Sequence, residues 1–195
     1  MTDLPELARK WTTDKALYYA AYYEQIFKDC RESVKRLLEF GIGYPQLMLK
    51  PAARAGARTY ICGASLFMWE EYFPNAQIYG VDIKPEILIN SGRIKSFCAD
   101  QSSDESLRRL FGEVLDEKLQ FDIIIDDGSH EPEDQIRTAK ICADFGMIAD
   151  GGFYIVEDAP PHDDEFVHFL PGINVEPVDF DDNPADPARI VVIRP

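Results

Sequence analysis

The fold is decided by one stretch of the sequence, Phe121-Asp122-Ile123-Ile124-Ile125-Asp126-Asp127-Gly128-Ser129-His130. Its first half is an apolar run typical of a buried strand, and its second half begins with two adjacent acids. The pattern recurs about one helix and one strand later, where Phe153-Tyr154-Ile155-Val156 runs directly into Glu157-Asp158. Open α/β sheets bind their ligands at the C-terminal ends of their parallel strands. We therefore expect two clusters of carboxylates side by side at that edge.

Four acids in one place repel one another unless some are protonated or a cation lies between them. A divalent metal ion is the simplest compensating charge, and the paired acidic strand ends place one between Asp127, Glu157 and Asp158. His130 follows Asp127 by three residues on the same expected edge, where it could take a proton beside the metal. A surface histidine, or a cap of the following helix, is the alternative interpretation of His130.

The composition limits the class of protein. The length of 195 residues fits one domain, with a helical segment over 1–32 and a core over 33–195. A net charge of −15 argues against a nucleic-acid partner, because phosphate contacts need clustered Lys and Arg. No apolar run approaches the roughly 20 residues of a membrane span, the start lacks an apolar secretory segment, and the four cysteines lack metal-ligand spacing. We expect a cytoplasmic protein without nucleic-acid or membrane partners, and homo-oligomers stay open.

Apolar periodicity predicts alternating strands and helices. Strands are expected at 34–40, 77–83, 94–99, 121–125, 153–156, 173–180 and 189–193. Helices are expected at 17–30, 65–73, 104–115 and 132–148, with a loop at 44–62 and a turn at 150–152. This order predicts an α/β fold with a doubly wound, mainly parallel, Rossmann-like sheet. The Pro- and Asp-rich linker before the last strand favours an antiparallel hairpin there.

Three other strand ends carry candidates for binding a nucleotide-like ligand. The first strand closes in Glu39-Phe40-Gly41-Ile42-Gly43, where the glycines would let the backbone approach a ligand and the acid could accept hydrogen bonds. The third glycine of a dinucleotide fingerprint is missing, so a plain strand-ending turn is an equal alternative. Asp82 ends the second strand, where doubly wound folds bind a ribose diol; a surface acid is its other interpretation. Asp100 and Gln101, after the third strand, would lie near an adenine.

Several motifs together carry a family resemblance. They are Thr13-Asp14-Lys15, Leu38-Glu39-Phe40-Gly41-Ile42-Gly43, Gly63-Ala64-Ser65-Leu66 with Trp69 and Tyr72-Phe73-Pro74-Asn75-Ala76, Tyr79-Gly80-Val81-Asp82-Ile83, Asp100-Gln101, Ile124-Ile125-Asp126-Asp127-Gly128-Ser129-His130 and Val156-Glu157-Asp158. In this order they resemble a class I S-adenosylmethionine-dependent methyltransferase, most closely the metal-dependent sugar O-methyltransferases of macrolide biosynthesis. The two acidic motifs and Thr-Asp-Lys are specific, whereas the glycine motif only supports them.

The resemblance implies a Rossmann-like methyltransferase fold and an activity. A hydroxyl of a small-molecule acceptor, a sugar or another natural product, would receive a methyl group from S-adenosylmethionine with the help of Mg²⁺. Asp127, Glu157 and Asp158 match the family's Mg²⁺ ligands, and His130 matches its general base. The methyl-donor site would be lined by Thr13, Ser65, Asp82 and Gln101, together with the candidates Glu39, Gly41, Gly43 and Asp100.

One departure from the family leaves the acceptor open. The family usually has a His just after Thr-Asp-Lys, whereas Leu17 and Tyr18 occupy that region here. The tyrosines of the helix at 17–30 are interpreted as packing residues. A nucleotide-dependent oxidoreductase is one alternative function, although the incomplete glycine fingerprint argues against it. A non-catalytic donor-binding or scaffold protein is another, against which stand His130 and the three acids.

Overall fold

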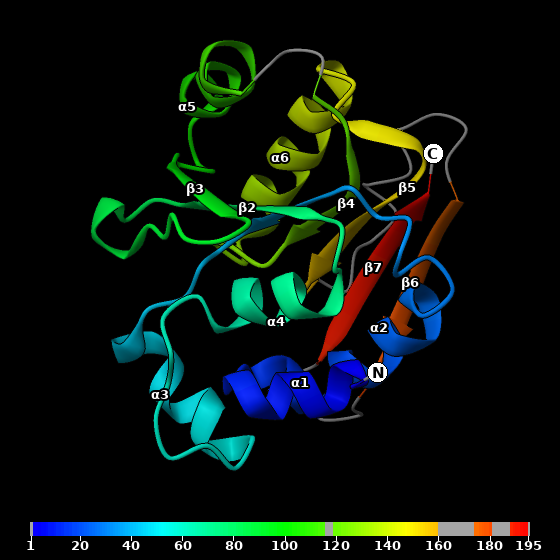
Figure 1. Ribbon diagram of the computed structural model, residues 1–195. Coiled ribbons are helices and arrows are strands. Elements are labelled where there is room, and N and C mark those ends of the chain that lie inside the picture. Colours follow the sequence, from blue (N-terminus) through cyan, green and yellow to red (C-terminus); the bar gives the residue numbers. More distant parts are fainter. Residues whose placement is uncertain (1, 116–118, 160–173, 181–187, 195) are drawn as a thin grey trace.

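A seven-stranded sheet forms the middle layer of the computed structural model, with helices on both faces (Figure 1). The structure describes residues 2–115, 119–159, 174–180 and 188–194. The strands are β1 (Arg36–Phe40), β2 (Gln77–Asp82), β3 (Ile94–Cys98), β4 (Phe121–Asp126), β5 (Ile148–Glu157), β6 (Asn174–Asp179) and β7 (Arg189–Arg194). Their order is β3-β2-β1-β4-β5-β7-β6, and β7 runs antiparallel to both of its neighbours while the other pairs are parallel. The doubly wound α/β fold and the antiparallel last strand are confirmed.

The helices divide between the two faces of the sheet. They are α1 (Leu4–Trp11), α2 (Tyr19–Phe27), α3 (Pro45–Arg54), α4 (Ala64–Tyr72), α5 (Asp104–Arg109) and α6 (Pro132–Asp144), with 3-10 turns at Asp14–Ala16 and Pro85–Ile87 and a π-helical turn at Leu110–Val114. Helices α1, α2 and α4 cover one face, and α5 and α6 cover the other (Figure 1). Each face therefore has its own apolar core.

The apolar runs of the central strands arise because both faces of these strands are buried. In β4, Ile123 and Ile125 pack toward α1, α2 and α4, whereas Phe121 and Ile124 pack toward α5 and α6. All four side chains are fully buried, as expected for parallel strands covered on both faces. Along the neighbouring strands the same alternation turns Glu39 and Glu157 toward the face of α1, α2 and α4. The pleat of the sheet thus decides where the acids of the site lie.

Two helices were not placed individually by the sequence prediction. Helix α1 lies within the helical segment predicted for 1–32 but was given no bounds of its own, although Leu4, Leu7, Ala8 and Trp11 recur at helical spacing, and Asp3 caps it by accepting a hydrogen bond from the Glu6 amide at 2.9 Å. The predicted loop at 44–62 was wrong over Pro45–Arg54, where α3 forms. Its two prolines suggested a loop. The first occupies the favoured first turn of the helix, and the second only interrupts one turn.

Some predicted boundaries were also wrong. The predicted helix at 132–148 ends at Asp144, and β5 already begins at Ile148, so the predicted turn at 150–152 lies inside a strand. The chain accommodates these glycines by a bulge, since Phe121 pairs with Ile148 while Ile123 pairs with Phe153. The helix expected at 17–30 begins only at Tyr19, and the one at 104–115 ends in a π-helical turn.

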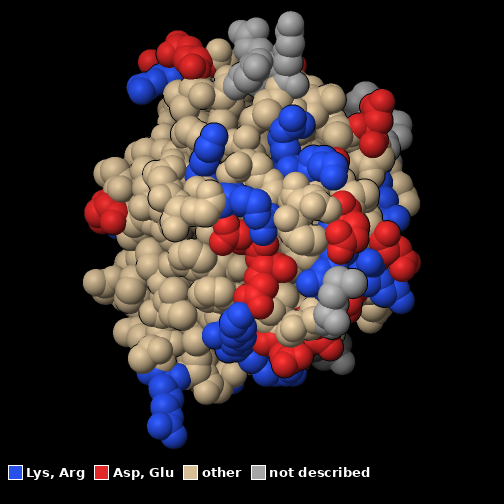
Figure 2. Space-filling model, viewed as in Figure 1, with Lys and Arg blue, Asp and Glu red and all other residues tan. Residues whose placement is uncertain are grey.

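The surface charges are mixed on the face viewed in Figure 1. Acidic side chains lie among Lys and Arg there, and much of the left part of this face carries few charges (Figure 2). One exposed pair is Lys10 and Glu71, whose nitrogen and oxygen are 2.5 Å apart. Within the described ranges, no helix is both long enough and apolar enough to cross a membrane.

A close approach of β1 and β4 requires glycine at position 41. Gly41 has a φ of +87°, and a Cβ there would lie 1.9 Å from the backbone oxygen of Asp127. The Asp127 amide in turn donates to the Phe40 oxygen at 3.0 Å. The glycine turn and the acidic motif are therefore held against each other by backbone contacts.

We expect Gly41→Ala to lower the free energy of unfolding by about 1–2 kcal/mol from the left-handed backbone alone. A further loss should follow because the new Cβ would displace the backbone of Asp127. Gly56→Ala is the matched control: Gly56 has the same φ of +87°, but its Cβ would meet no atom within 4 Å. Denaturant unfolding measures both variants, and equal losses would contradict the close approach.

Candidate active site

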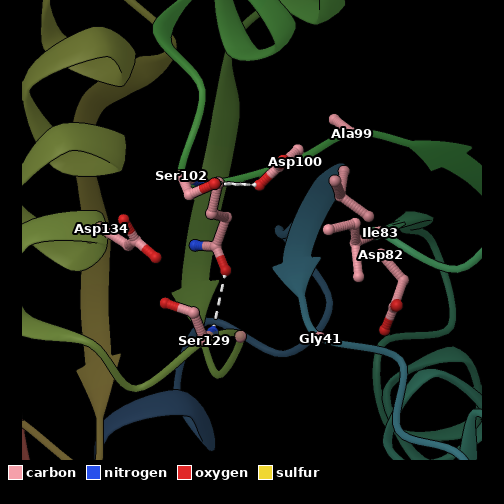
Figure 3. Close-up of a pocket in the computed structure, with 11 residues that line it drawn as sticks. Gly41, Asp82, Ile83, Ala99, Asp100, Ser102, Ser129 and Asp134 are labelled. Atoms are coloured by element: carbon pink, nitrogen blue, oxygen red, sulfur yellow. Dashed lines mark hydrogen bonds between the residues drawn. The ribbon is translucent and has the colours of Figure 1, made fainter.

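A cleft opens at the C-terminal ends of β1, β2 and β3 (Figure 3). Asp82, Asp100 and Ser129 border it from three different segments, and Gly41 lies at its base. The adjoining part of the cleft lies beside Thr13, Gly43 and Ser65. The structure therefore brings together seven of the eight predicted donor-site residues, which are Thr13, Gly41, Gly43, Ser65, Asp82, Asp100 and Gln101. The eighth, Glu39, is fully buried behind them.

Asp82 is fixed at the end of β2 by two backbone amides. Its Oδ2 accepts a hydrogen bond from the Ile42 amide at 2.9 Å, and its Oδ1 accepts one from the Lys84 amide at 3.0 Å. These bonds hold the carboxylate beside the glycine turn. Each carboxylate oxygen keeps a further lone pair, so Asp82 can still accept hydrogen bonds from a ligand.

Gln101 joins the loop after β3 to the loop after β4. Its Nε2 donates to Asp126 Oδ1 at 2.8 Å, and its Oε1 accepts from the Ser129 amide at 3.1 Å (Figure 3). Asp100 Oδ1 likewise accepts from the amide and hydroxyl of Ser102, at 2.9 and 2.7 Å. These two predicted donor-site residues therefore also shape the cleft by bonds within the protein.

An ammonium group lies among the acids behind this cleft. Lys15 Nζ is 2.6 Å from Asp127 Oδ2, 2.7 Å from Glu157 Oε2 and 3.2 Å from Glu39 Oε1. The three acids come from the C-terminal ends of β1, β4 and β5, which are neighbours in the sheet. The second oxygen of Glu39 accepts a hydrogen bond from the Ser65 hydroxyl at 2.7 Å. We call Lys15, Glu39, Asp127 and Glu157 the inner group.

The inner group is buried apart from Asp127, whose side chain is 20% exposed, and its charges depend on one another. Burial alone would lower the pKa of Lys15, but Asp127, Glu157 and Glu39 together raise it well above its ordinary value. Burial alone would raise the pKa of Asp127, but Lys15 and His130 hold it at about 2. Burial raises the pKa of both Glu39 and Glu157, against the opposing effect of Lys15. The ammonium therefore stays charged, keeps Asp127 ionised and opposes the effect of burial on the two glutamates.

Asp127 also belongs to a second, more exposed group with His130 and Asp158. His130 Nε2 is 3.2 Å from Asp127 Oδ1, and its Nδ1 is 3.5 Å from Asp158 Oδ2. The three side chains offer ligand atoms that all lie within 4.8 Å of one another. We call them the outer group. A hydrogen bond to Asp127 raises the pKa of His130 to about 9, so the imidazole is protonated at neutral pH in this state.

Two tyrosines of α2 pack in the apolar core, as predicted, and also bind the acids of the site. Tyr19 donates a hydrogen bond to Asp158 Oδ1 at 2.5 Å, and Tyr23 donates one to Glu157 Oε1 at 2.6 Å. Helix α2 thus fixes both acids at the end of β5. Lys15 was missed as a site residue, although it stands in the Thr13-Asp14-Lys15 motif. No local pattern marks these contacts, because they join residues more than 110 positions apart.

A second cleft lies on the other side of His130. Its walls include the apolar side chains of Leu17, Leu47, Met48 and Pro51, and it reaches Asp158. Leu47 is 60% exposed and borders both this cleft and the donor-side cleft. Helix α3, which replaced the predicted loop, therefore borders both clefts through Leu47 and Met48, and the two clefts also share His130.

Comparisons with known proteins give this geometry its context. No family model matches the chain. The chain is 33% identical over 162 residues to the mycinamicin VI 2''-O-methyltransferase of Micromonospora griseorubida, covering 80% of this chain and 36% of that protein. It is 34% identical over 173 residues to the L-olivosyl-oleandolide 3-O-methyltransferase of Streptomyces antibioticus, covering 87% and 39%. The chain thus spans less than two fifths of the length of these curated relatives.

Solved structures of methyltransferases also resemble this chain. The MycE methyltransferase of the mycinamycin biosynthetic pathway, in complex with Mg, SAH and mycinamycin VI, matches 99% of this chain and 54% of that chain, with a TM-score of 0.67 and 25% identity. The SAH-bound Podospora anserina methyltransferase PaMTH1 matches 100% and 88% at 16% identity, with a TM-score of 0.58, and shows the fold alone. The resemblance seen in the sequence is confirmed: the homologues of this chain are sugar O-methyltransferases of the mycinamicin, oleandolide and tetracenomycin type, and it has the Rossmann-like methyltransferase fold.

Proposed function

We propose that this chain transfers a methyl group from S-adenosylmethionine to a hydroxyl of a small glycosylated natural product, with the help of Mg²⁺. One observation carries the proposal: the donor-side cleft and the second cleft meet at His130. His130 lies beside the acids of the inner and outer groups, which together we call the acidic centre. A methyl donor and an acceptor placed in the two clefts would have their reacting atoms beside one histidine. The curated relatives act on sugar hydroxyls, which supports a sugar as the acceptor group.

The donor cleft contains groups that suit the polar parts of S-adenosylmethionine. Asp82 can accept hydrogen bonds from the two ribose hydroxyls. Gly41 and Gly43 leave the backbone of the glycine turn open to the ligand. Thr13 and Ser65 offer hydroxyl groups further along the same cleft. The relatives reported above are methyltransferases, so nothing in them favours the nucleotide-dependent oxidoreductase considered as an alternative.

The acidic centre fits a divalent cation by its charge and its donor atoms. Five carboxylates surround Lys15 and His130, those of Asp14, Glu39, Asp127, Glu157 and Asp158. Burial, followed by the charge of Asp127, raises the pKa values of both Asp14 and Asp158. Carboxylate oxygens are the ligands that Mg²⁺ prefers. We infer that Asp127 and Asp158 hold the ion through their more exposed oxygens. Glu157 completes the predicted acidic set from the inner side, where its two oxygens accept hydrogen bonds from Lys15 and Tyr23.

The protein's own residues would align the reaction and take up the proton. When bound, the sulfonium donor supplies the methyl group, and the divalent cation lowers the pKa of the acceptor hydroxyl. His130 Nε2 lies at the junction of the clefts, where the imidazole is protonated beside Asp127. It must first release that proton to solvent, and the neutral imidazole can then accept the proton of the hydroxyl. The walls of the two clefts would hold donor and acceptor in line. Because the sulfonium already carries a good leaving group, this alignment is the main task of the protein.

Asp82→Asn should weaken binding of S-adenosylhomocysteine by about 1–3 kcal/mol, because a charged hydrogen-bond acceptor is lost. Isothermal titration calorimetry measures the affinity. Asp179→Asn is the control, since Asp179 is an exposed acid of β6 that pairs with Arg189 at 3.5 Å. An unchanged affinity in folded Asp82→Asn would remove Asp82 from the donor site.

Removal of divalent cations with EDTA should abolish turnover, and Mg²⁺ should restore it. Turnover is measured as S-adenosylhomocysteine released with mycinamicin VI or with rhamnosides as acceptors.

His130→Ala should reduce turnover by about 10²–10⁴-fold, the usual contribution of a positioned base, while donor affinity stays unchanged. Full turnover in EDTA would exclude the metal. Donor binding without turnover on any glycoside would favour the non-catalytic alternative.

His130 should titrate near pH 9 in protein kept free of divalent cations. Asp127→Asn should bring its pKa down toward the ordinary value of about 6.5, because the main partner of the charged imidazole is neutralised. NMR of the imidazole protons measures the titration, and His130→Gln identifies the signal. A wild-type pKa near 6.5 would show that the ion pair with Asp127 does not form in solution.

A further inference from the structure

Lys15 lies at the centre of a set of oxygens of the kind that binds metal ions. Glu39, Asp127 and Glu157 each offer one carboxylate oxygen, and these atoms all lie within 4.8 Å of one another. The ammonium nitrogen is in direct contact with all three acids, at 2.6 to 3.2 Å. Three anionic oxygens that converge on one point form a donor set for a hard divalent cation. Here that point is occupied by a side chain of the protein itself.

Two features keep Lys15 in this position. It belongs to the 3-10 turn Asp14–Ala16, and its amide donates to the Thr13 hydroxyl at 3.4 Å. Its side chain is only 1% exposed, and its withdrawal would leave two buried carboxylates and the partly buried Asp127 without this counter-charge. The same carboxylates keep the ammonium protonated, so Lys15 does not serve as a base.

We propose that Lys15 takes the place of a second cation, so that the acidic centre binds its divalent ion only on the outer side of Asp127. The two oxygens of Asp127 separate the two sides: Oδ2 accepts a hydrogen bond from Lys15, and Oδ1 faces His130. Lys15 is therefore a positioning residue, which turns one oxygen of Asp127 inward and leaves the other for the reaction. The single outer ion rests on the proposed function, whereas the assignment of Lys15 does not.

Lys15→Met tests the proposal, because methionine keeps most of the chain length and removes the charge. Mn²⁺, counted per chain by equilibrium dialysis and electron paramagnetic resonance, is the probe. We expect the variant to bind one more Mn²⁺ than the wild type, at the three inner carboxylates. Lys10→Met is the control, since Lys10 pairs with Glu71 on the surface and should leave the count unchanged.

The readout is a difference between two proteins, so it does not depend on the proposed function. If the wild type binds no Mn²⁺ and Lys15→Met binds one, the metal of the proposed function fails while the role of Lys15 stands. If both proteins bind the same number of ions, the role of Lys15 as a second cation is overturned. Turnover is not needed for either conclusion.

A loss of folding would not leave the question open. In chelator, Lys15→Met should melt well below the wild type, and Mn²⁺ should raise its Tm by more than it raises that of the wild type, because an ion replaces the ammonium. A variant that stays unfolded in Mn²⁺ would contradict the proposal. The double variant Lys15→Met/Glu39→Gln removes one acid together with the ammonium. It should fold more stably in chelator than Lys15→Met and should bind no additional Mn²⁺.

Discussion

The structure depends on the contact between one buried ammonium and the carboxylates that end three neighbouring strands. Strand pairing alone brings Glu39, Asp127 and Glu157 to one edge, because β1, β4 and β5 are parallel and in register. In an apolar interior these charges would oppose folding. Lys15, delivered from the segment before the first strand, offsets that repulsion. The sheet can therefore hold several carboxyl groups at the edge where parallel sheets bind ligands, with one ammonium opposing their repulsion.

The features that could be predicted from the sequence are those set by local pattern. Buried strands such as Phe121–Asp126 follow from apolar runs, and the acids that follow them were placed at the correct edge by the rule for parallel sheets. Helix α3 was not predicted, because its two prolines and the Ala, Arg and Gly around them suggested a loop. The contacts of Lys15 and Tyr23 were out of reach for another reason. They depend on which distant segment the fold lays over the strand ends, and a pattern within a short window does not contain that information.

Two of the three residues other than glycine that have a left-handed backbone, within the described part of the chain, belong to the outer group. His130 has a φ of 59° and Asp158 a φ of 49°, both in the left-handed region that residues other than glycine seldom adopt. Such conformations persist only where the surroundings enforce them. Here the enforcement comes from the sheet beneath the loops and from the Tyr19 hydroxyl that binds Asp158. The histidine is thus presented by a rigid turn, so its direction is set before any ligand arrives.

The position of β7 between β5 and β6 has a consequence for synthesis on the ribosome. Tyr154 of β5 pairs with Ile193 of β7, so one edge of β5 has no partner until the last described strand has been made. The other side of β5 pairs with β4, and it already carries Glu157 to the ammonium of the N-terminal segment. The nascent chain can therefore close its charged centre while the far side of the sheet is still open. An open strand edge invites pairing with other chains. During synthesis, the free edge of β5 is thus open to other chains after the acids of the site have formed and before β7 covers it.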